Sequence, residues 1–203
     1  TAAGSGFSRW RDLAVTRWRE DTTRDCWGTF VFLRDVRTGG VWSAGFHPVG
    51  APADQYEAVY SEDRARISQK DRSLSITLEV VVSPEDDAEL RRLTVTNRES
   101  RSREIDFTSY AEVVLAPQAA DEAHPAFSNL FVQTEFVPEA ETLLATRRPR
   151  SEGEPQVWLA HPDWFMPKGP YGSVLIPSDM HAFDLANLAV IDYIKSLGAR
   201  VGE

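Results

Sequence analysis

Apolar and polar residues alternate with a period of two along most of the chain, and this alternation predicts β-strands. Within residues 73–83 one face carries Leu74, Ile76, Leu78, Val80 and Val82, and the other carries Ser73, Ser75, Thr77 and Glu79. Within residues 104–115 the apolar face carries Ile105, Phe107, Ala111, Val113 and Leu115. Such alternation is typical of a strand with one buried face and one solvated face.

The pattern recurs often enough to predict the fold class. A third strand is expected at 88–97, followed by the polar turn Asn97–Ser100. Further strands are expected at 27–34, 41–46, 56–61, 64–69, 128–136, 141–147 and 156–160. Many short strands at this spacing, with almost no helical periodicity before residue 175, predict an all-β fold, an antiparallel β-sandwich.

The last forty residues follow a different pattern. Ser178 is suited to an N-cap, Gly198 to the position after a helix, and the apolar residues between them at helical spacing are Phe183, Val190, Ile194 and Leu197. We therefore expect a sandwich over residues 1–162, and a linker or tail over 163–203 with a helix at about 179–197. Both methionines also lie beyond Pro162. That shift in composition indicates either chance in a short stretch or a tail of separate origin.

Composition and charge exclude several classes of function. The chain has 203 residues, 42% of them hydrophobic, and a net charge of -9, which disfavours nucleic-acid binding. No apolar run approaches the roughly 18 residues that cross a bilayer, and no signal peptide opens the chain, so we expect cytoplasmic residence without direct membrane insertion. One cysteine, Cys26, excludes an internal disulfide, and the histidine spacing predicts no metal site. The first residue, Thr1, favours a piece of a longer polypeptide.

Residues 1–35 combine Trp and Phe with Arg and Asp in close succession. Exposed strand faces more commonly use Thr, Lys or Ser. Interleaved aromatic rings, guanidinium groups and carboxylates suit a surface that stacks on a sugar ring or on a neighbouring subunit.

Several of these segments also carry a family resemblance. They are GSGFSRWRD (residues 4–12), GTFVFLRD (residues 28–35, with Thr29 a departure from the family pattern), Trp42-Ser43 within VWSAGFHPVG (residues 41–50), YEAVYSEDRARI (residues 56–67), and the segments at 78–97 and 102–117. Together they resemble the cyclic β-1,2-glucan synthases, in the N-terminal β-sandwich of their phosphorylase-like region. That region belongs to glycoside hydrolase family 94, formerly glycosyltransferase family 36. The segments are more distantly similar to cellobiose and chitobiose phosphorylases, and the resemblance covers about residues 4–162.

The resemblance implies a sandwich of the supersandwich type that precedes an (α/α)6 barrel in the same parent chain. In the family the barrel holds the general acid and the phosphate site of an inverting phosphorolysis, a hexosyl transfer. Such a barrel needs about 300 residues of helix, so this chain is expected to be a fragment that is inactive alone and has no catalytic residue or cofactor. Inorganic phosphate would be used by the parent enzyme, which the resemblance implies is associated with the inner membrane.

The resemblance further implies three partners: the catalytic barrel, a β-glucan oligosaccharide, and a second copy in a homodimer. The candidate residues for carbohydrate or interface contact are Ser5, Gly6, Phe7, Ser8, Arg9, Trp10, Asp12, Arg17, Trp18 and Arg19. Phe7 and Trp10 would provide stacking faces, and Arg9 and Asp12 hydrogen bonds to hydroxyl groups.

Other readings of the same residues stay open. The loop at 4–12 would be only a mobile terminus if its Gly and Ser residues lack structure. The charges at 17–25 form either an interface lattice or a set of solvated ions. At the level of the whole chain, a stand-alone carbohydrate-binding module and a purely structural or adhesive sandwich are the alternatives.

Overall fold

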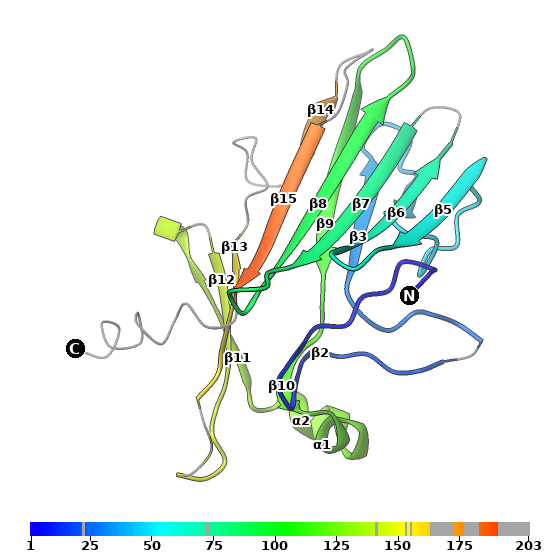
Figure 1. Ribbon diagram of the computed structural model, residues 1–203. Coiled ribbons are helices and arrows are strands. Elements are labelled where there is room, and N and C mark those ends of the chain that lie inside the picture. The colour runs from blue at the N-terminus through cyan, green and yellow to red at the C-terminus, as the bar shows by residue number, and fades with distance from the viewer. Residues whose placement is uncertain are drawn as a thin grey trace.

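The computed structural model describes residues 1–162, apart from 22, 72, 73, 141, 153 and 155, together with strands at 173–176 and 183–190. The largest sheet has eight strands, in the order β11-β12-β13-β15-β8-β7-β6-β5, and every pair is antiparallel. Its strands are β5 (Gln55–Tyr60), β6 (Arg64–Lys70), β7 (Leu74–Val82), β8 (Ala88–Asn97), β11 (Val132–Val137), β12 (Thr142–Arg147), β13 (Trp158–Pro162) and β15 (Phe183–Val190). β11 and β5 form its two margins (Figure 1).

Two smaller antiparallel sheets pack against the large one. The first has the order β14-β9-β3-β4 and lies behind β7 and β8 in Figure 1. The second has the order β1-β2-β10. Their strands are β1 (Arg9–Trp10), β2 (Leu13–Thr16), β3 (Phe30–Asp35), β4 (Val41–Ser43), β9 (Arg103–Tyr110), β10 (Val113–Pro117) and β14 (Ser173–Ile176). The short helices are α1 (Gln118–Ala123), α2 (Pro125–Asn129) and the 3-10 turn η1 (Pro138–Ala140). The predicted antiparallel β-sandwich is confirmed.

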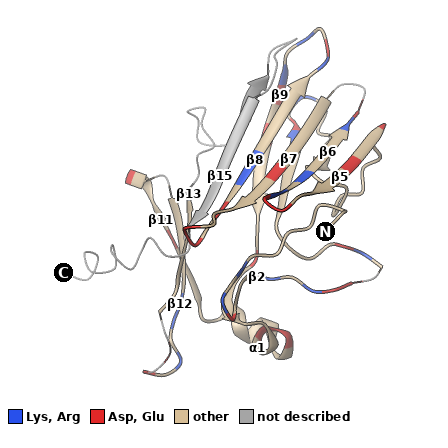
Figure 2. Ribbon diagram, in the orientation of Figure 1, with Lys and Arg blue, Asp and Glu red and all other residues tan. Residues whose placement is uncertain are grey.

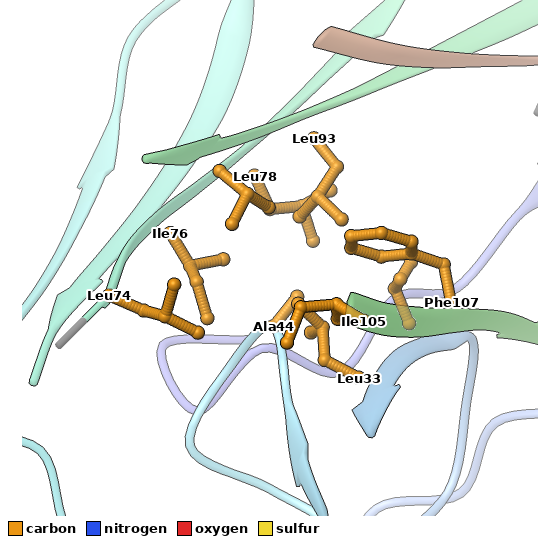
Figure 3. Packing of buried hydrophobic residues seen from close by; sticks show 10 residues of the cluster. Leu33, Ala44, Leu74, Ile76, Leu78, Leu93, Ile105 and Phe107 are labelled. Carbon is orange, nitrogen blue, oxygen red and sulfur yellow. The ribbon is translucent and has the colours of Figure 1, made fainter. Parts of the chain in front are cut away.

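The main core lies between the large sheet and the four-stranded sheet. Leu78 of β7 and Leu93 of β8 point toward Leu33 of β3 and Ile105 of β9, and none of these side chains is more than 4% exposed (Figure 3). Leu93 and Ile105 are thus buried, as the alternation of apolar and polar residues in the sequence predicts. Val82, which has the same parity on β7, is 65% exposed because the opposing sheet does not reach that end of the strand.

A second core lies under the three-stranded sheet. Val15 of β2 and Leu115 of β10 pack against Ala145 and Leu159 of the large sheet, and Trp10 packs at the border of this cluster. Residues 10–15 are therefore anchored on the half of the sheet opposite to β5.

The outward face of the large sheet is polar and its charges alternate in sign. Arg66 of β6 pairs with Glu79 of β7, which pairs with Arg92 of β8. This row appears in Figure 2 as blue, red and blue bands across adjacent strands. Opposite charges on neighbouring strands stabilise such a face.

The strand expected at 104–115 is two strands in the structure. β9 ends at Tyr110, and β10 begins at Val113 in a different sheet. The pairing of β10 with β2 shifts register between Val113 and Ala116, and Leu115 has a φ of 50°. This bulge changes the parity, so Val114, Leu115 and Ala116 are all buried, whereas Ala111 is exposed.

The helix expected at about 179–197 is wrong over residues 183–190, which form strand β15. The remainder of that expected helix lies outside the described residues. β15 pairs with β8 over eight residues, and β14 pairs with β9, so the sheets continue past residue 162 instead of giving way to a separate tail. The open backbone edge of β8 provides hydrogen-bond partners that outweigh a weak helical spacing.

Two further local differences concern residues 118–129, where α1 and α2 occupy a region for which no helix was expected. As a result β11 begins at Val132 and not at residue 128. Among the described residues, no helix is long and apolar enough to cross a membrane.

Candidate carbohydrate-contact cleft

The loop at residues 4–8 is held in one conformation by close backbone packing. Gly4 has a φ of 99°, and a Cβ there would lie 2.6 Å from the Cα of Gly45. Ser5 is buried and its hydroxyl donates to the carbonyl oxygen of Trp27. The backbone N–H of Thr29 donates to the carbonyl of Gly6 at 3.0 Å. This segment is therefore ordered and not the mobile terminus considered as an alternative.

A buried ion pair on β8 fixes the next part of the loop. The Nε of Arg91 donates to one carboxylate oxygen of Glu89 at 2.6 Å, and the Ser8 hydroxyl donates to the other at 3.0 Å. The Arg91 and Glu89 side chains are only 11% and 14% exposed. A Cβ on Gly6 would lie 2.9 Å from an Nη of Arg91, so the glycine gives the guanidinium its space.

These contacts form one wall of a cavity of about 350 Å³, called here the N-terminal cleft. The four loop residues Phe7, Ser8, Arg9 and Trp10 line it. The other wall comes from the β7–β8 turn, β8, β9 and β13, with Val82, Asp86, Asp87, Glu89, Arg91, Ser109, Leu159 and His161 among the lining residues. Apolar and aromatic surface thus alternates with hydrogen-bonding groups around one concavity.

Two polar groups at the cleft have no protein partner among the described residues. The indole Nε1 of Trp10 and the Oγ1 of Thr29 are buried without a hydrogen bond. The Arg91 guanidinium, whose Nε bonds to Glu89, also lines the cleft. Buried polar groups without partners cost free energy, and because the Trp10 and Thr29 atoms have almost no accessible surface, a ligand oxygen removes that cost only when the loop shifts to expose them.

The aromatic residues at the cleft are partly used by the protein itself. The Arg11 guanidinium lies 4.3 Å from the centroid of the Trp10 ring and covers one of its faces. Phe7 contacts Trp18 at a centroid distance of 5.9 Å. Trp10 thus contacts both Arg11 and the second core, which leaves only part of its ring for a ligand, and Trp18 contacts Phe7.

Arg9 and Asp12 lie at the outer side of the loop. Their side chains are 56% and 100% exposed and their charged atoms are 3.8 Å apart. Arg9 lines the cleft, whereas Asp12 is not among its lining residues. A hydroxyl contact from Arg9 is compatible with this position, and one from Asp12 requires a ligand that extends beyond the cleft.

Arg17 does not reach the surface where sugar or interface contact was expected. It is 5% exposed and donates from Nε and Nη2 to both carboxylate oxygens of Asp121, at 2.9 and 2.7 Å. It also donates to Glu112 and, at 2.7 Å, to the Oδ1 of Asn129. The expected surface role is wrong for Arg17, because this bidentate network ties β2 to α1 and α2 inside the domain.

Two neighbouring charges, Asp21 and Arg19, make separate local contacts. Asp21 accepts hydrogen bonds from the backbone N–H groups of Thr23 and Arg24 and so closes its own turn. The Arg19 guanidinium lies 5.2 Å from the centroid of the Trp27 ring, and its Nε and Nη2 are buried without a hydrogen-bond partner among the described residues.

The Arg17 network shifts the pKa values of its members. Burial alone would raise the pKa of Asp121, but the hydrogen bond and charge of Arg17 outweigh it and hold the pKa below the ordinary value. The hydrogen bond from Arg17 to Asp121 in turn raises the pKa of Arg17. Both groups are therefore charged at neutral pH.

We expect acid to destabilise the domain through Asp121. Its pKa is lower in the folded than in the unfolded state, so its contribution is complete above the unfolded value of about 3.9 and is lost as pH falls through the folded value. Urea unfolding between about pH 7 and pH 2 measures this loss. Asp121→Asn should flatten the acid limb, and parallel profiles for the two proteins would contradict the assignment.

Within the described residues, no cluster of three or more His, Cys, Asp or Glu side chains could hold a metal ion. Glu89, Arg91, Thr29 and His161 were not expected at the cleft. A signal for two of them exists: Glu89 and Arg91 share the parity of the buried Leu93 on β8. Charged residues on the inward parity of a strand indicate a buried ion pair or a site.

Comparison with known proteins places the sequence in a family. The model of the family described as glycosyl hydrolase 94, supersandwich domain, matches residues 1–163. The cyclic β-(1,2)-glucan synthase NdvB of Rhizobium meliloti (strain 1021) is 40% identical over 161 residues, which are 79% of this chain and 6% of that protein.

Two phosphorylases are more distant relatives. The solabiose phosphorylase of Paenibacillus borealis is 26% identical over 64% of this chain and 16% of its own length. The N,N'-diacetylchitobiose phosphorylase of Vibrio furnissii is 26% identical over 60% of this chain and 16% of its own length. The chain thus spans only a small part of each relative. By the match over residues 1–163, it belongs to the supersandwich domain family of glycosyl hydrolase 94.

Proposed function

We propose that this chain is the non-catalytic sandwich domain of a β-glucan synthase or inverting glycoside phosphorylase, and that it holds part of a glucan in the N-terminal cleft. The observation that supports this most strongly is the cleft itself, where the unpaired Nε1 of Trp10 and the guanidinium groups of Arg9 and Arg91 lie beside apolar wall residues. The names of the relatives, a β-(1,2)-glucan synthase and two phosphorylases, agree with a carbohydrate ligand.

The chemistry of the cleft suits a neutral sugar better than an ion. Arg9 and Arg91 face the carboxylates of Asp86, Asp87 and Glu89, so neither sign of charge dominates. A glucose ring offers oxygen acceptors and hydroxyl donors at its edge and C–H groups on its faces. Sugar oxygens would accept hydrogen bonds from Trp10, Arg9 and Arg91, the carboxylates would accept from hydroxyls, and the accessible part of the Trp10 ring would contact C–H groups.

We assign no bond-making step to this chain. Inverting phosphorolysis needs a carboxylic acid that protonates the glycosidic oxygen and an inorganic phosphate that attacks the opposite face of the sugar. We propose that a helical barrel elsewhere in the parent polypeptide supplies both, and that the sandwich braces this barrel and presents glucan to it.

Titration of the 203-residue chain with β-1,2-gluco-oligosaccharides by calorimetry tests the proposal. Trp10→Phe keeps an aromatic ring but removes the Nε1 donor, and should weaken binding about tenfold, since a buried hydrogen bond is lost. Tyr60→Phe is the matched control, because Tyr60 is 55% exposed on β5, lies outside the cleft, and likewise loses one hydrogen-bonding group; it should leave binding unchanged. Absence of binding at millimolar sugar, or equal effects of both variants, would contradict the proposal.

A further inference from the structure

The outward face of the four-stranded sheet carries side chains that do not line the N-terminal cleft. This sheet lies behind β7 and β8 in Figure 1, and Val31 and Leu33 of β3 turn inward to the main core. The alternate residues Phe32 and Arg34 therefore point outward. Phe32 is half-buried, and the Arg34 side chain is 59% exposed. Outward strand faces more commonly carry Thr, Lys or Ser, so this aromatic and guanidinium pair indicates a contact surface.

The neighbouring strands complete a hollow of about 620 Å³ on this face, called here the β3–β9 hollow. Thr108 of β9 lies beside Phe32 in the strand register. Val41 of β4 and Asp106 of β9 pair with Arg34 from its two sides. All five residues line the hollow, and Val41 is 48% exposed. Ligand sites in proteins commonly have volumes of about 300–1,000 Å³, so the hollow is large enough for a small molecule.

Aromatic rings fix the apolar part of this hollow. The Phe32 ring contacts the rings of Phe30 and Tyr110, at centroid distances of 6.2 and 6.3 Å. Phe30 is 3% exposed and anchors this cluster in the domain. The Tyr110 hydroxyl donates to Glu112 at 3.1 Å, which holds the second ring in place. A ligand therefore meets a ring that is already positioned, and little conformational entropy is lost on binding.

An ion pair forms the polar part of the hollow. The Nε of Arg34 donates to the Oδ2 of Asp106 at 2.8 Å, and the Nη2 of Arg34 donates to the same oxygen. The Asp106 side chain is 20% exposed and lines the hollow, as Arg34 does. A donor and an acceptor that lie side by side match two adjacent hydroxyl groups. One hydroxyl accepts from the guanidinium while the other donates to the carboxylate.

We propose that the β3–β9 hollow is a second glucan site, which binds a β-1,2-linked glucan through adjacent hydroxyls of one glucose ring. The β-1,2 linkage uses positions 1 and 2, so the 3- and 4-hydroxyls stay free on internal rings. One of them accepts a hydrogen bond from Arg34, the other donates to Asp106, and the C–H face of the ring packs on Phe32. The choice of glucan rests on the proposed function, whereas the hollow shares no residue with the cleft.

The same geometry predicts a preference among glucans. A β-1,3 linkage leaves the 2-, 4- and 6-hydroxyls free on internal rings, and no two of these are on neighbouring carbon atoms. One member of the Arg34–Asp106 pair would then lose water without gaining a sugar partner, which costs free energy. An anion is disfavoured for a related reason, since the Asp106 carboxylate already pairs with Arg34 and would repel a second negative charge.

The two glucan sites lie on opposite faces of β9. Ser109 lines the N-terminal cleft, whereas the preceding residue, Thr108, lines the hollow. Consecutive residues of a strand point to opposite faces of its sheet. A short oligosaccharide in one site therefore does not touch the other, and a substitution in one site leaves binding at the other unchanged.

Two-dimensional NMR of the 203-residue chain resolves the two sites. Arg34→Met identifies the Arg34 Nε–H resonance by its loss, and the Trp10 indole resonance reports on the cleft. Added β-1,2-gluco-oligosaccharide should shift the Arg34 resonance along a saturating curve, and Trp10→Phe should not alter that curve. Phe32→Leu keeps an apolar side chain but removes the ring, and should weaken binding at Arg34 by about tenfold.

A comparison of linkages tests the recognition of adjacent hydroxyls. In a soluble β-1,3-glucan only the terminal rings carry adjacent free hydroxyls. Such a glucan should bind at Arg34 about tenfold more weakly when concentrations are counted in glucose rings, because one hydrogen bond to a charged group is lost.

Calorimetry provides a matched control. Arg34→Met should remove one of two sugar sites. Arg64→Met removes an ion pair of the same kind, since the Arg64 side chain is 48% exposed and donates from Nε and Nη2 to one oxygen of Asp63, at 3.0 and 2.9 Å. Arg64 lines neither the cleft nor the hollow, so both sites should remain. Circular dichroism confirms that the variants fold.

The outcomes separate the second site from the proposed function. An Arg34 shift with a Trp10 resonance that stays in place would support the hollow and contradict the cleft. The reverse result would remove the second site and leave the cleft standing. Equal losses in Arg34→Met and Arg64→Met, or equal affinity for the two linkages, would contradict recognition by the ion pair. Inorganic phosphate that shifts the Arg34 resonance where sugar does not would show an anion site instead.

Discussion

Replacing Arg17 with methionine is expected to lower the free energy of unfolding by about 3–5 kcal/mol. The substitution keeps an unbranched chain of similar length but removes the cation that faces Asp121 and Glu112. Asp121 is 4% exposed, so its carboxylate would remain in the interior without a counter-charge. The cost comes mainly from that uncompensated charge and from lost hydrogen bonds to α1 and α2.

Urea unfolding at pH 7 measures the effect. Arg9→Met is the matched control, because the Arg9 side chain is 56% exposed and its pairing with Asp12 is loose at 3.8 Å. Surface ion pairs of this kind contribute little, so the control should change stability by less than about 0.5 kcal/mol. A loss below about 1 kcal/mol in Arg17→Met would show that the network does not hold the N-terminal sheet to the helices.

Gly4→Ala is expected to cost about 2–5 kcal/mol and to abolish sugar binding in the N-terminal cleft. Part of the cost is the left-handed backbone, since a residue with a Cβ at a φ of 99° is strained by about 1–2 kcal/mol. The rest is overpacking, because the new Cβ would lie 2.6 Å from the backbone of Gly45, which no rotamer change relieves. The loop would have to move, and Phe7 to Trp10 would move with it.

Gly39→Ala separates these two contributions. Gly39 has a φ of 72°, yet a Cβ there meets no atom within 4 Å. It should therefore show the backbone cost alone and bind sugar as the unmodified chain does. Thermal unfolding and calorimetric titration of both variants check this. Equal destabilisation by the two substitutions would mean that the contact between Gly4 and Gly45 does not position the loop.

The sandwich was predictable because its strands carry their signal locally. On β7, Leu74, Ile76 and Leu78 are 3%, 3% and 4% exposed, as period-two alternation requires. β8 has the predicted bounds. The strand is recognisable because alternate side chains over most of its length meet the core and the remaining ones meet solvent.

The predictions fail where pairing with a strand that is distant in the sequence determines the local structure. Residues 183–190 carry apolar positions that also fit a helix, but the backbone of β8 lies within pairing distance along their whole length. At Val113 to Ala116, the bulge that moves the chain into another sheet has no turn residue to mark it. The sequence of residues 183–190 does not reveal that β8 has a free edge, and the sequence at Val113 to Ala116 does not mark a bulge.

The candidate site likewise has a part that the sequence predicts and a part that it does not. Phe7 to Trp10 are contiguous and form one recognisable segment, and the structure brings them together at the cleft. Glu89 lies 81 residues from its partner Ser8, and only the parity of β8 hints at a role for it and Arg91. Arg17 sits in the same charged stretch as Arg19, but its partner Asp121 is 104 residues distant, so its burial could not be inferred from its neighbours.

Two-dimensional NMR of the indole N–H groups tests the sugar cleft most directly. The chain has six tryptophans, and Trp10→Phe identifies the Trp10 resonance by its loss. Because the Trp10 Nε1 is buried without an acceptor among the described residues, a bound glucan should supply one and shift that resonance more than any other as β-1,2-gluco-oligosaccharide is added. A Trp10 resonance that stays in place while other tryptophans shift, or a spectrum unchanged at millimolar sugar, would contradict the account.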